Sequence, residues 1–163
     1  MDLLKSAKIF LIESLNNYMK PTERDHEYSL SFPILHATIS VELLLKERLR
    51  RVNENLIYVQ DKNGKYTKNT IGIKELPKIL GEHGIEIKGH QKLLIVHMTK
   101  WRNHIVHSIP VHDVQKAKIE LERLYDFVCF FLATHLNENI NSFLPKEYYQ
   151  KLARVISELQ QAI

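Results

Sequence analysis

The chain has 163 residues, of which 44% are hydrophobic and 26% are charged. This balance excludes a disordered tail and predicts a single globular domain over residues 1–163. The net charge of +4 is compatible with a polyanionic partner without requiring one. No stretch contains the 18 or more apolar residues that a membrane span requires, and the N-terminus lacks a secretory signal. We therefore expect a cytoplasmic protein that makes no contact with a membrane.

Cys129 is the only cysteine, which excludes an internal disulfide and a zinc site built on thiolates. Phe127, Val128, Phe130 and Phe131 surround it in the sequence. We therefore expect a buried structural thiol, because a nucleophilic cysteine needs an electropositive and partly exposed setting.

The first 52 residues show the three- and four-residue spacing of apolar side chains that is typical of amphipathic helices. They predict one helix over residues 2–20, a polar link over 22–28 and a second helix over 32–52. The second helix ends in a basic cluster, which we interpret as a solvated helix end or as a patch that contacts phosphate. The cluster comprises Lys46, Arg48, Arg50 and Arg51.

The helical spacing is lost between residues 53 and 73. A short β-prone run over residues 56–59 is followed by Asn63-Gly64, a strong turn signal. A small β-hairpin is therefore predicted over about 55–70. Its Lys62, Lys65 and Lys68 would either be solvated or approach nucleic acid.

Helical spacing returns in the second half of the chain. It predicts a short accessory helix over 74–80 ended by Gly81, and longer helices over 90–107, 112 or 113–136, and 146–163. The predicted fold is all-α. We expect an up-and-down helical bundle of four main helices, with the accessory helix and the hairpin added.

Side chains suited to acid–base chemistry gather where the 90–107 helix should end. Asn103 and His107 are four residues apart and share a helix face, and Arg102 has a stem long enough to curl toward them. A histidine transfers protons near neutral pH, and a guanidinium stabilises charge on phosphorus. An amide orients these two groups. Cleavage of RNA through the ribose 2′-hydroxyl needs these groups and no metal.

Arg102-Asn103-x3-His107 is similar to the RX4-6H motif of HEPN domains, helical bundles found in toxin–antitoxin, abortive-infection and other defence systems. Residues 36–46, in which an alanine and apolar residues lead to Lys46, resemble an earlier helix of the same family. The resemblance covers most of the chain. The sequence differs from some toxin members just after the motif. Those members have a tyrosine two residues after the motif histidine, which a partner enzyme modifies, whereas this chain has Ser108 and Ile109.

The resemblance implies a metal-independent endoribonuclease without a cofactor, active as a homodimer whose two motifs meet at a shared cleft. His107 would transfer the proton, Arg102 would hold the phosphate of the RNA substrate, and Asn103 would orient them. His104 and Lys46 are further candidates for a supporting role. An antitoxin or another regulatory partner would control the activity.

Three other interpretations remain open. The first is a non-catalytic HEPN-like module that binds RNA, a nucleotide or a protein, and the second is a helical interaction protein. The third is a metal site that uses His104, His107, His112 and Asp113. The motif would have a purely structural role if its cations only complemented the dipole at the helix end. We expect His97 and Trp101 to be core or interface residues.

Overall fold

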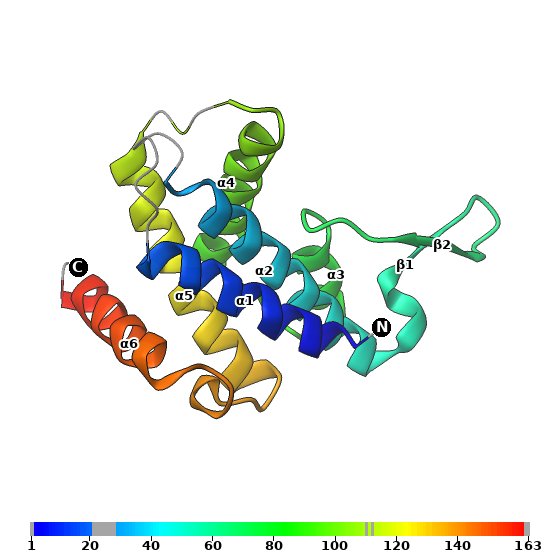
Figure 1. Cartoon of the computed structure of the whole chain (residues 1–163). Coiled ribbons are helices and arrows are strands. Elements are labelled where there is room, and N and C mark those ends of the chain that lie inside the picture. The colour runs from blue at the N-terminus through cyan, green and yellow to red at the C-terminus, as the bar shows by residue number, and fades with distance from the viewer. Residues whose placement is uncertain (1, 21–28, 110, 112, 162–163) are drawn as a thin grey trace.

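A computed structural model describes residues 2–20, 29–109, 111 and 113–161. They form an all-α bundle with one small two-stranded antiparallel sheet, which projects from it (Figure 1). The predicted fold class is confirmed. The predicted link over 22–28 lies outside the described residues.

Helices α1 (Leu3–Met19) and α2 (Ser31–Val52) form an antiparallel pair (Figure 1). Small side chains allow the two backbones to approach, and the Ser40 hydroxyl donates to the carbonyl of Ala7 at 2.8 Å. The Ser14 hydroxyl donates to the Pro33 carbonyl at 2.6 Å and lies 2.8 Å from the Tyr125 hydroxyl. Buried polar groups need such partners, so these bonds hold α1 to α2 and to the centre of the bundle.

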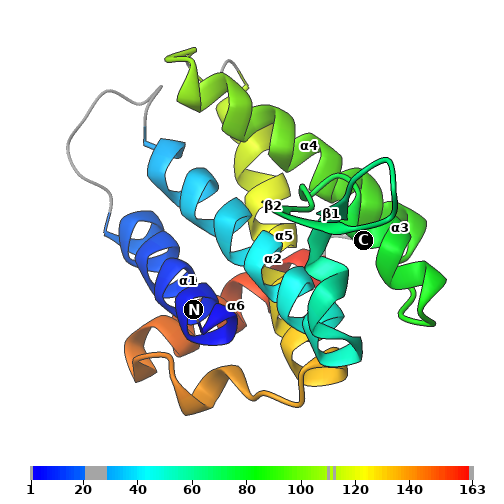
Figure 2. The same ribbon diagram turned by 90° about the vertical axis from the view of Figure 1, so that its right-hand side faces the viewer.

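Helices α4 (Gly89–Val106) and α5 (Val114–His135) complete the bundle around α2 (Figure 2). The apolar spacing of α5 continues through the whole helix, and Leu121, Leu124, Val128 and Phe131 are almost fully buried. Helix α6 (Lys146–Gln161) follows the short η3 (Ile140–Ser142) and packs outside α1 and α5. It buries Tyr148 and Leu152 and leaves most of its other side chains exposed or half-buried.

The hairpin is confirmed, but it is shorter than predicted. Residues 54–57 form a 3-10 helix, η2 (Glu54–Ile57), and not the expected strand; β1 (Tyr58–Gln60) and β2 (Tyr66–Thr70) follow. The Asp61 carboxylate accepts from the backbone N–H groups of Asn63 and Lys65, which closes the turn. Gly64 has a φ of 77°, a backbone conformation that costs glycine little.

The accessory helix is also confirmed, with a different end. Helix α3 (Leu76–Glu82) includes Gly81, which was predicted to stop it. The chain leaves the helix at Gly84 instead, where φ is 81°. The helix therefore ends two residues later than predicted, at Glu82 instead of residue 80.

The basic end of α2 makes specific contacts within the bundle and is not only a solvated helix end. Glu47 is 4% exposed, and its carboxylate accepts hydrogen bonds from Arg50 and Arg51 at 2.9–3.0 Å. Arg51 also donates to the Leu136 carbonyl at the end of α5. Burial by itself would raise the pKa of Glu47, but hydrogen bonds and charge from the two arginines outweigh it and lower the pKa.

Glu47→Gln is expected to lower the free energy of unfolding by about 2 kcal/mol at neutral pH, because both arginines lose a charged acceptor. The folded-state pKa of Glu47 is lowered, so its stabilising effect is complete above the ordinary glutamate pKa and is lost as pH falls through the folded value. Urea unfolding at pH 7 and pH 3 measures both effects. Glu86→Gln is the control, because Glu86 is an exposed glutamate outside this cluster; an equal loss at both pH values would contradict the prediction.

Candidate functional site

Residues 102–106 form the end of α4 and His107 caps it, at the end of the bundle where α2 begins (Figure 2). The helix stops because Ser108 adopts a φ of 60°, and the Ile109 N–H turns back to the His104 carbonyl at 2.8 Å. The helix thus ends in a residue with left-handed backbone conformation, and this residue is a serine in place of the usual glycine. The turn leaves His107 exposed as the residue that caps α4.

The structure brings Arg102 and Asn103 together. The Arg102 Nη2 atom lies 3.3 Å from the Asn103 side-chain oxygen, and both residues are half-buried. The His107 backbone N–H donates to the Asn103 carbonyl at 3.2 Å, so His107 follows Asn103 by one helical turn. Within the described part of the chain the His107 ring has no side-chain hydrogen bond, so it is free to meet a ligand.

The two supporting candidates lie apart from this group. His104 is exposed, and its ring stands perpendicular to that of Trp101 with the centroids 6.3 Å apart. Lys46 is 8% exposed; it donates to the Thr70 hydroxyl at 3.0 Å and lies 3.6 Å from Glu42. It follows the first residue of α2 by roughly 22 Å along the helix, while the motif lies near the start of α2. Within one chain, Lys46 is therefore not brought to Arg102, Asn103 or His107.

A buried carboxylate that the sequence analysis missed organises the neighbouring face of α4. Glu120 on α5 is 7% exposed. One of its oxygens accepts from the Trp101 indole N–H at 2.7 Å, and the other lies 3.1 Å from Nδ1 of His97. Ala117, three residues earlier, and Leu124, four residues later, are both core residues. A glutamate at a core position of a helix was thus the signal in the sequence.

These residues line a recess between α4 and the start of α5, which we call the indole recess. It has a volume of about 230 Å³. Its lining residues are His97, Lys100, Trp101, His104, Lys116 and Glu120. Trp101 and His97 were predicted to be core or interface residues; both are half-buried, and both face this recess.

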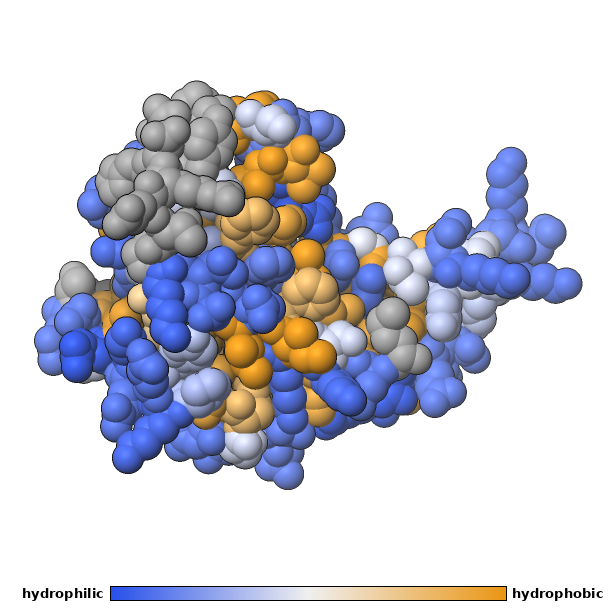
Figure 3. Space-filling view, viewed as in Figure 1, coloured by the Kyte–Doolittle hydropathy of each residue, from blue (hydrophilic) through white to orange (hydrophobic). Residues whose placement is uncertain are grey.

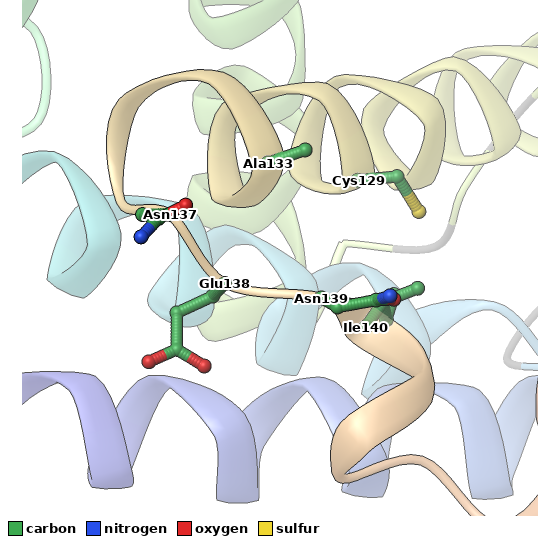
Figure 4. Close-up of a pocket in the computed structure, with 6 residues that line it drawn as sticks. All are labelled: Cys129, Ala133, Asn137, Glu138, Asn139 and Ile140. Atoms are coloured by element: carbon green, nitrogen blue, oxygen red, sulfur yellow. The ribbon is translucent and has the colours of Figure 1, made fainter.

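A second recess of about 360 Å³ lies around the end of α5, where Cys129, Ala133 and Ile140 contribute to its wall (Figure 4). The Glu138 carboxylate points away toward α1 and accepts from Lys8 at 3.0 Å. Burial, together with the charge of Asp126, raises the pKa of Cys129 to about 12. The thiol is half-buried and stays protonated, which matches a structural cysteine and not a nucleophile.

In residues 2–20, 29–109, 111 and 113–161, no three His, Cys, Asp or Glu side chains come together as a metal site. His112, part of the metal interpretation, lies outside these residues. Asp113 caps α5 by accepting from the Lys116 backbone N–H at 3.0 Å. The described helices include none that is long and apolar enough to cross a membrane.

Glu120→Ala is expected to lower the free energy of unfolding by about 1–3 kcal/mol, because the indole N–H of Trp101 loses its acceptor in a half-buried site. Trp101 is the only tryptophan, so its emission should also shift to longer wavelength as water reaches the ring. Chemical unfolding followed by fluorescence measures both quantities. The exposed Glu158 on α6 supplies the control, Glu158→Ala; if the two variants were equally stable, Glu120 would not hold α4 to α5.

Comparisons of the chain with protein-family models, with curated proteins and with solved structures find no match. The likeness to HEPN domains therefore depends on residues 36–46 and 102–107 themselves.

Proposed function

We propose that the protein is a metal-independent endoribonuclease of the HEPN type. The observation that carries the proposal is the contact between Arg102 and Asn103 one turn before an exposed His107. A cation, an amide and an imidazole then share the accessible end of one helix. These are the groups that cleavage of RNA through the 2′-hydroxyl requires.

In the proposed reaction, His107 takes the proton of a ribose 2′-hydroxyl. The oxygen attacks the adjacent phosphorus, the P–O5′ bond breaks, and the leaving oxygen receives a proton. The products are a 2′,3′-cyclic phosphate and a free 5′-hydroxyl. Arg102 stabilises the charge that builds up on the phosphoryl oxygens, and Asn103 keeps the guanidinium in place through the 3.3 Å contact.

The proposal includes a homodimer, because one helix end is an open surface and not a cleft. Val106 and Ile109, on either side of His107 in the sequence, are 61% and 40% exposed. Hydrophobic side chains also gather over the end of α4 in Figure 3, while the hairpin is mostly hydrophilic. Covering them with a second copy would bring two motifs together and remove apolar surface from water.

The cellular setting forms the last part of the proposal. The resemblance of residues 36–46 and 102–107 to HEPN domains supports an assignment to toxin or defence systems in the cytoplasm, under an antitoxin or another regulatory partner. The positive net charge favours the encounter with RNA.

His107→Ala is expected to lower the rate of RNA cleavage by about 10²–10⁴-fold, the usual effect of removing a positioned acid or base. Arg102→Ala should lower it to a similar extent. The assay uses purified protein, RNA and a chelator, with a 2′-deoxy oligonucleotide that should stay intact. His90→Ala is the matched control, because His90 is an exposed histidine at the other end of α4. Equal cleavage by wild type and His107→Ala would refute the assignment, and no cleavage by either would favour a non-catalytic binding module.

Val106→Glu is expected to convert a dimer into monomers and to lower cleavage at least about tenfold, because a charge would enter the apolar contact. Sedimentation at several protein concentrations measures the oligomeric state. Val59→Glu is the control, because Val59 is 39% exposed on the hairpin, away from the motif. A monomeric wild-type protein with full activity would contradict the dimer.

A further inference from the structure

We propose that a recess between α5 and α6 binds a small organic amine, with its protonated amino group beside Asp126 and its apolar body against Cys129. We call it the α5–α6 recess, and its volume is about 310 Å³. Arg102, Asn103 and His107 do not line it. The inference is therefore independent of RNA cleavage, and it concerns a ligand whose charge is opposite to that of RNA.

The recess exists because α6 buries little of its surface against the bundle. Along α6, only Tyr148 and Leu152 are buried. Tyr149 and Ile156 are half-buried, and Ala153 is exposed. These last three residues line the recess together with Leu152. The recess is thus the part of the contact between α6 and α5 that the side chains of α6 leave unfilled.

The lining is mostly apolar. Cys129 of α5 and Ile140 of η3 face the four α6 residues named above, and Ser157 and Gln160 supply the hydrophilic part. None of these described residues carries a charge. An apolar ligand would therefore gain free energy by leaving water, whereas an anionic group would find no cation in the lining.

The Asp126 carboxylate supplies a charge beside the recess. Asp126 precedes Cys129 by three residues on α5, and residues at this spacing are neighbours on a helix surface. Burial, and after it the negative charge of Asp126, raises the pKa of the Cys129 thiol, so the carboxylate and the thiol interact. Within the part of the chain that the structure describes, Asp126 has neither an ion pair nor a side-chain hydrogen bond.

An unpaired carboxylate in a half-buried position favours a cationic ligand. Burial raises the pKa of Asp126, because the charged form has lost part of its hydration. An ammonium group would provide the missing countercharge. A ligand carboxylate would instead meet like charge, and a neutral ligand would leave Asp126 unpaired. The recess and Asp126 together select a molecule with one cationic end and an apolar remainder.

The size of the recess limits the ligand further. Pockets for drug-sized ligands run from about 300 to 1,000 Å³, and the α5–α6 recess lies at the lower limit. A short aliphatic or aromatic amine is therefore a better fit than a large cofactor. The recess around the end of α5 shares Cys129 and Ile140 with it, so a longer apolar tail has room to continue toward Ala133 (Figure 4).

Calorimetry with the full-length protein at neutral pH tests the charge of the ligand. The probes are octylamine, octanol and octanoate, which share an apolar chain and carry a positive charge, no charge and a negative charge. Octylamine is expected to bind at least about tenfold more tightly than octanol, because a paired charge adds to the same apolar contact. Octanoate should bind more weakly than octanol.

Asp126→Asn tests the partner of the amino group. It is expected to weaken octylamine binding about tenfold and to leave octanol binding unchanged, because the amide keeps the shape of the carboxylate and loses its charge. The matched control is Glu158→Gln, which removes an exposed carboxylate of α6 that does not line the recess. This control should leave both affinities unchanged.

Cys129 reports where the amine binds, because it is the only cysteine and it lines the recess. Its alkylation by iodoacetamide, followed by mass spectrometry, should slow as octylamine saturates the protein. Ala153→Phe is expected to weaken octylamine binding at least about tenfold, since the ring would fill the recess. Ala153→Ser, which adds little volume, is its control. Ala153 is exposed, so the fold should persist in both variants.

Four results would overturn the proposal. They are octylamine binding that does not saturate, equal affinities for octylamine and octanol, unchanged octylamine affinity in Asp126→Asn, and unchanged alkylation of Cys129 at saturating octylamine. None of these measurements involves RNA. Failure of the proposed ribonuclease would therefore leave the amine site standing, and failure of the amine site would leave the ribonuclease standing.

Discussion

The buried Glu120 carboxylate ties the second half of α4 to α5 in addition to their apolar packing. The fully buried side chains of α4 lie in its middle, at Ile95, Met98 and Thr99, while Trp101 and Ile105 pack against the core and are half-buried. Glu120 joins this part of α4 to α5 by accepting from Trp101 and contacting His97. A hydrogen bond to a buried carboxylate is directional, whereas an apolar contact is not. The same bonds therefore hold the stretch of α4 that leads into Arg102 against α5.

This arrangement links the proposed cleavage motif to the indole recess. Lys100 and His104 line the recess, and Arg102 and Asn103 belong to the same two turns of α4. The contacts that shape the recess therefore also hold the helix that carries the motif.

Much of the fold was predictable because each long helix repeats its apolar side chains without interruption. The bundle, the accessory helix and the hairpin turn follow from that spacing and from Asn63-Gly64. The 3-10 helix at Glu54–Ile57 was not predictable, because its apolar residues fit a strand equally well. The end of α3 was missed because glycine at position 81 tolerates helical backbone.

The candidate site was predictable in its residue types and not in its contacts. The spacing of Asn103 and His107 fixes a shared side of the helix, and the bond from Arg102 to Asn103 agrees with the expected curl of the guanidinium. The place of Lys46 beside Thr70 and the role of Glu120 depend on which helices become neighbours, which local spacing does not encode. The hairpin has a consequence of another kind. A two-stranded sheet that projects from the body has outer edges able to pair with another chain's backbone. Lys68 lies on β2, and Lys62 and Lys65 lie in the turn beside it, so like charge at this hairpin opposes edge-to-edge pairing between copies of this protein.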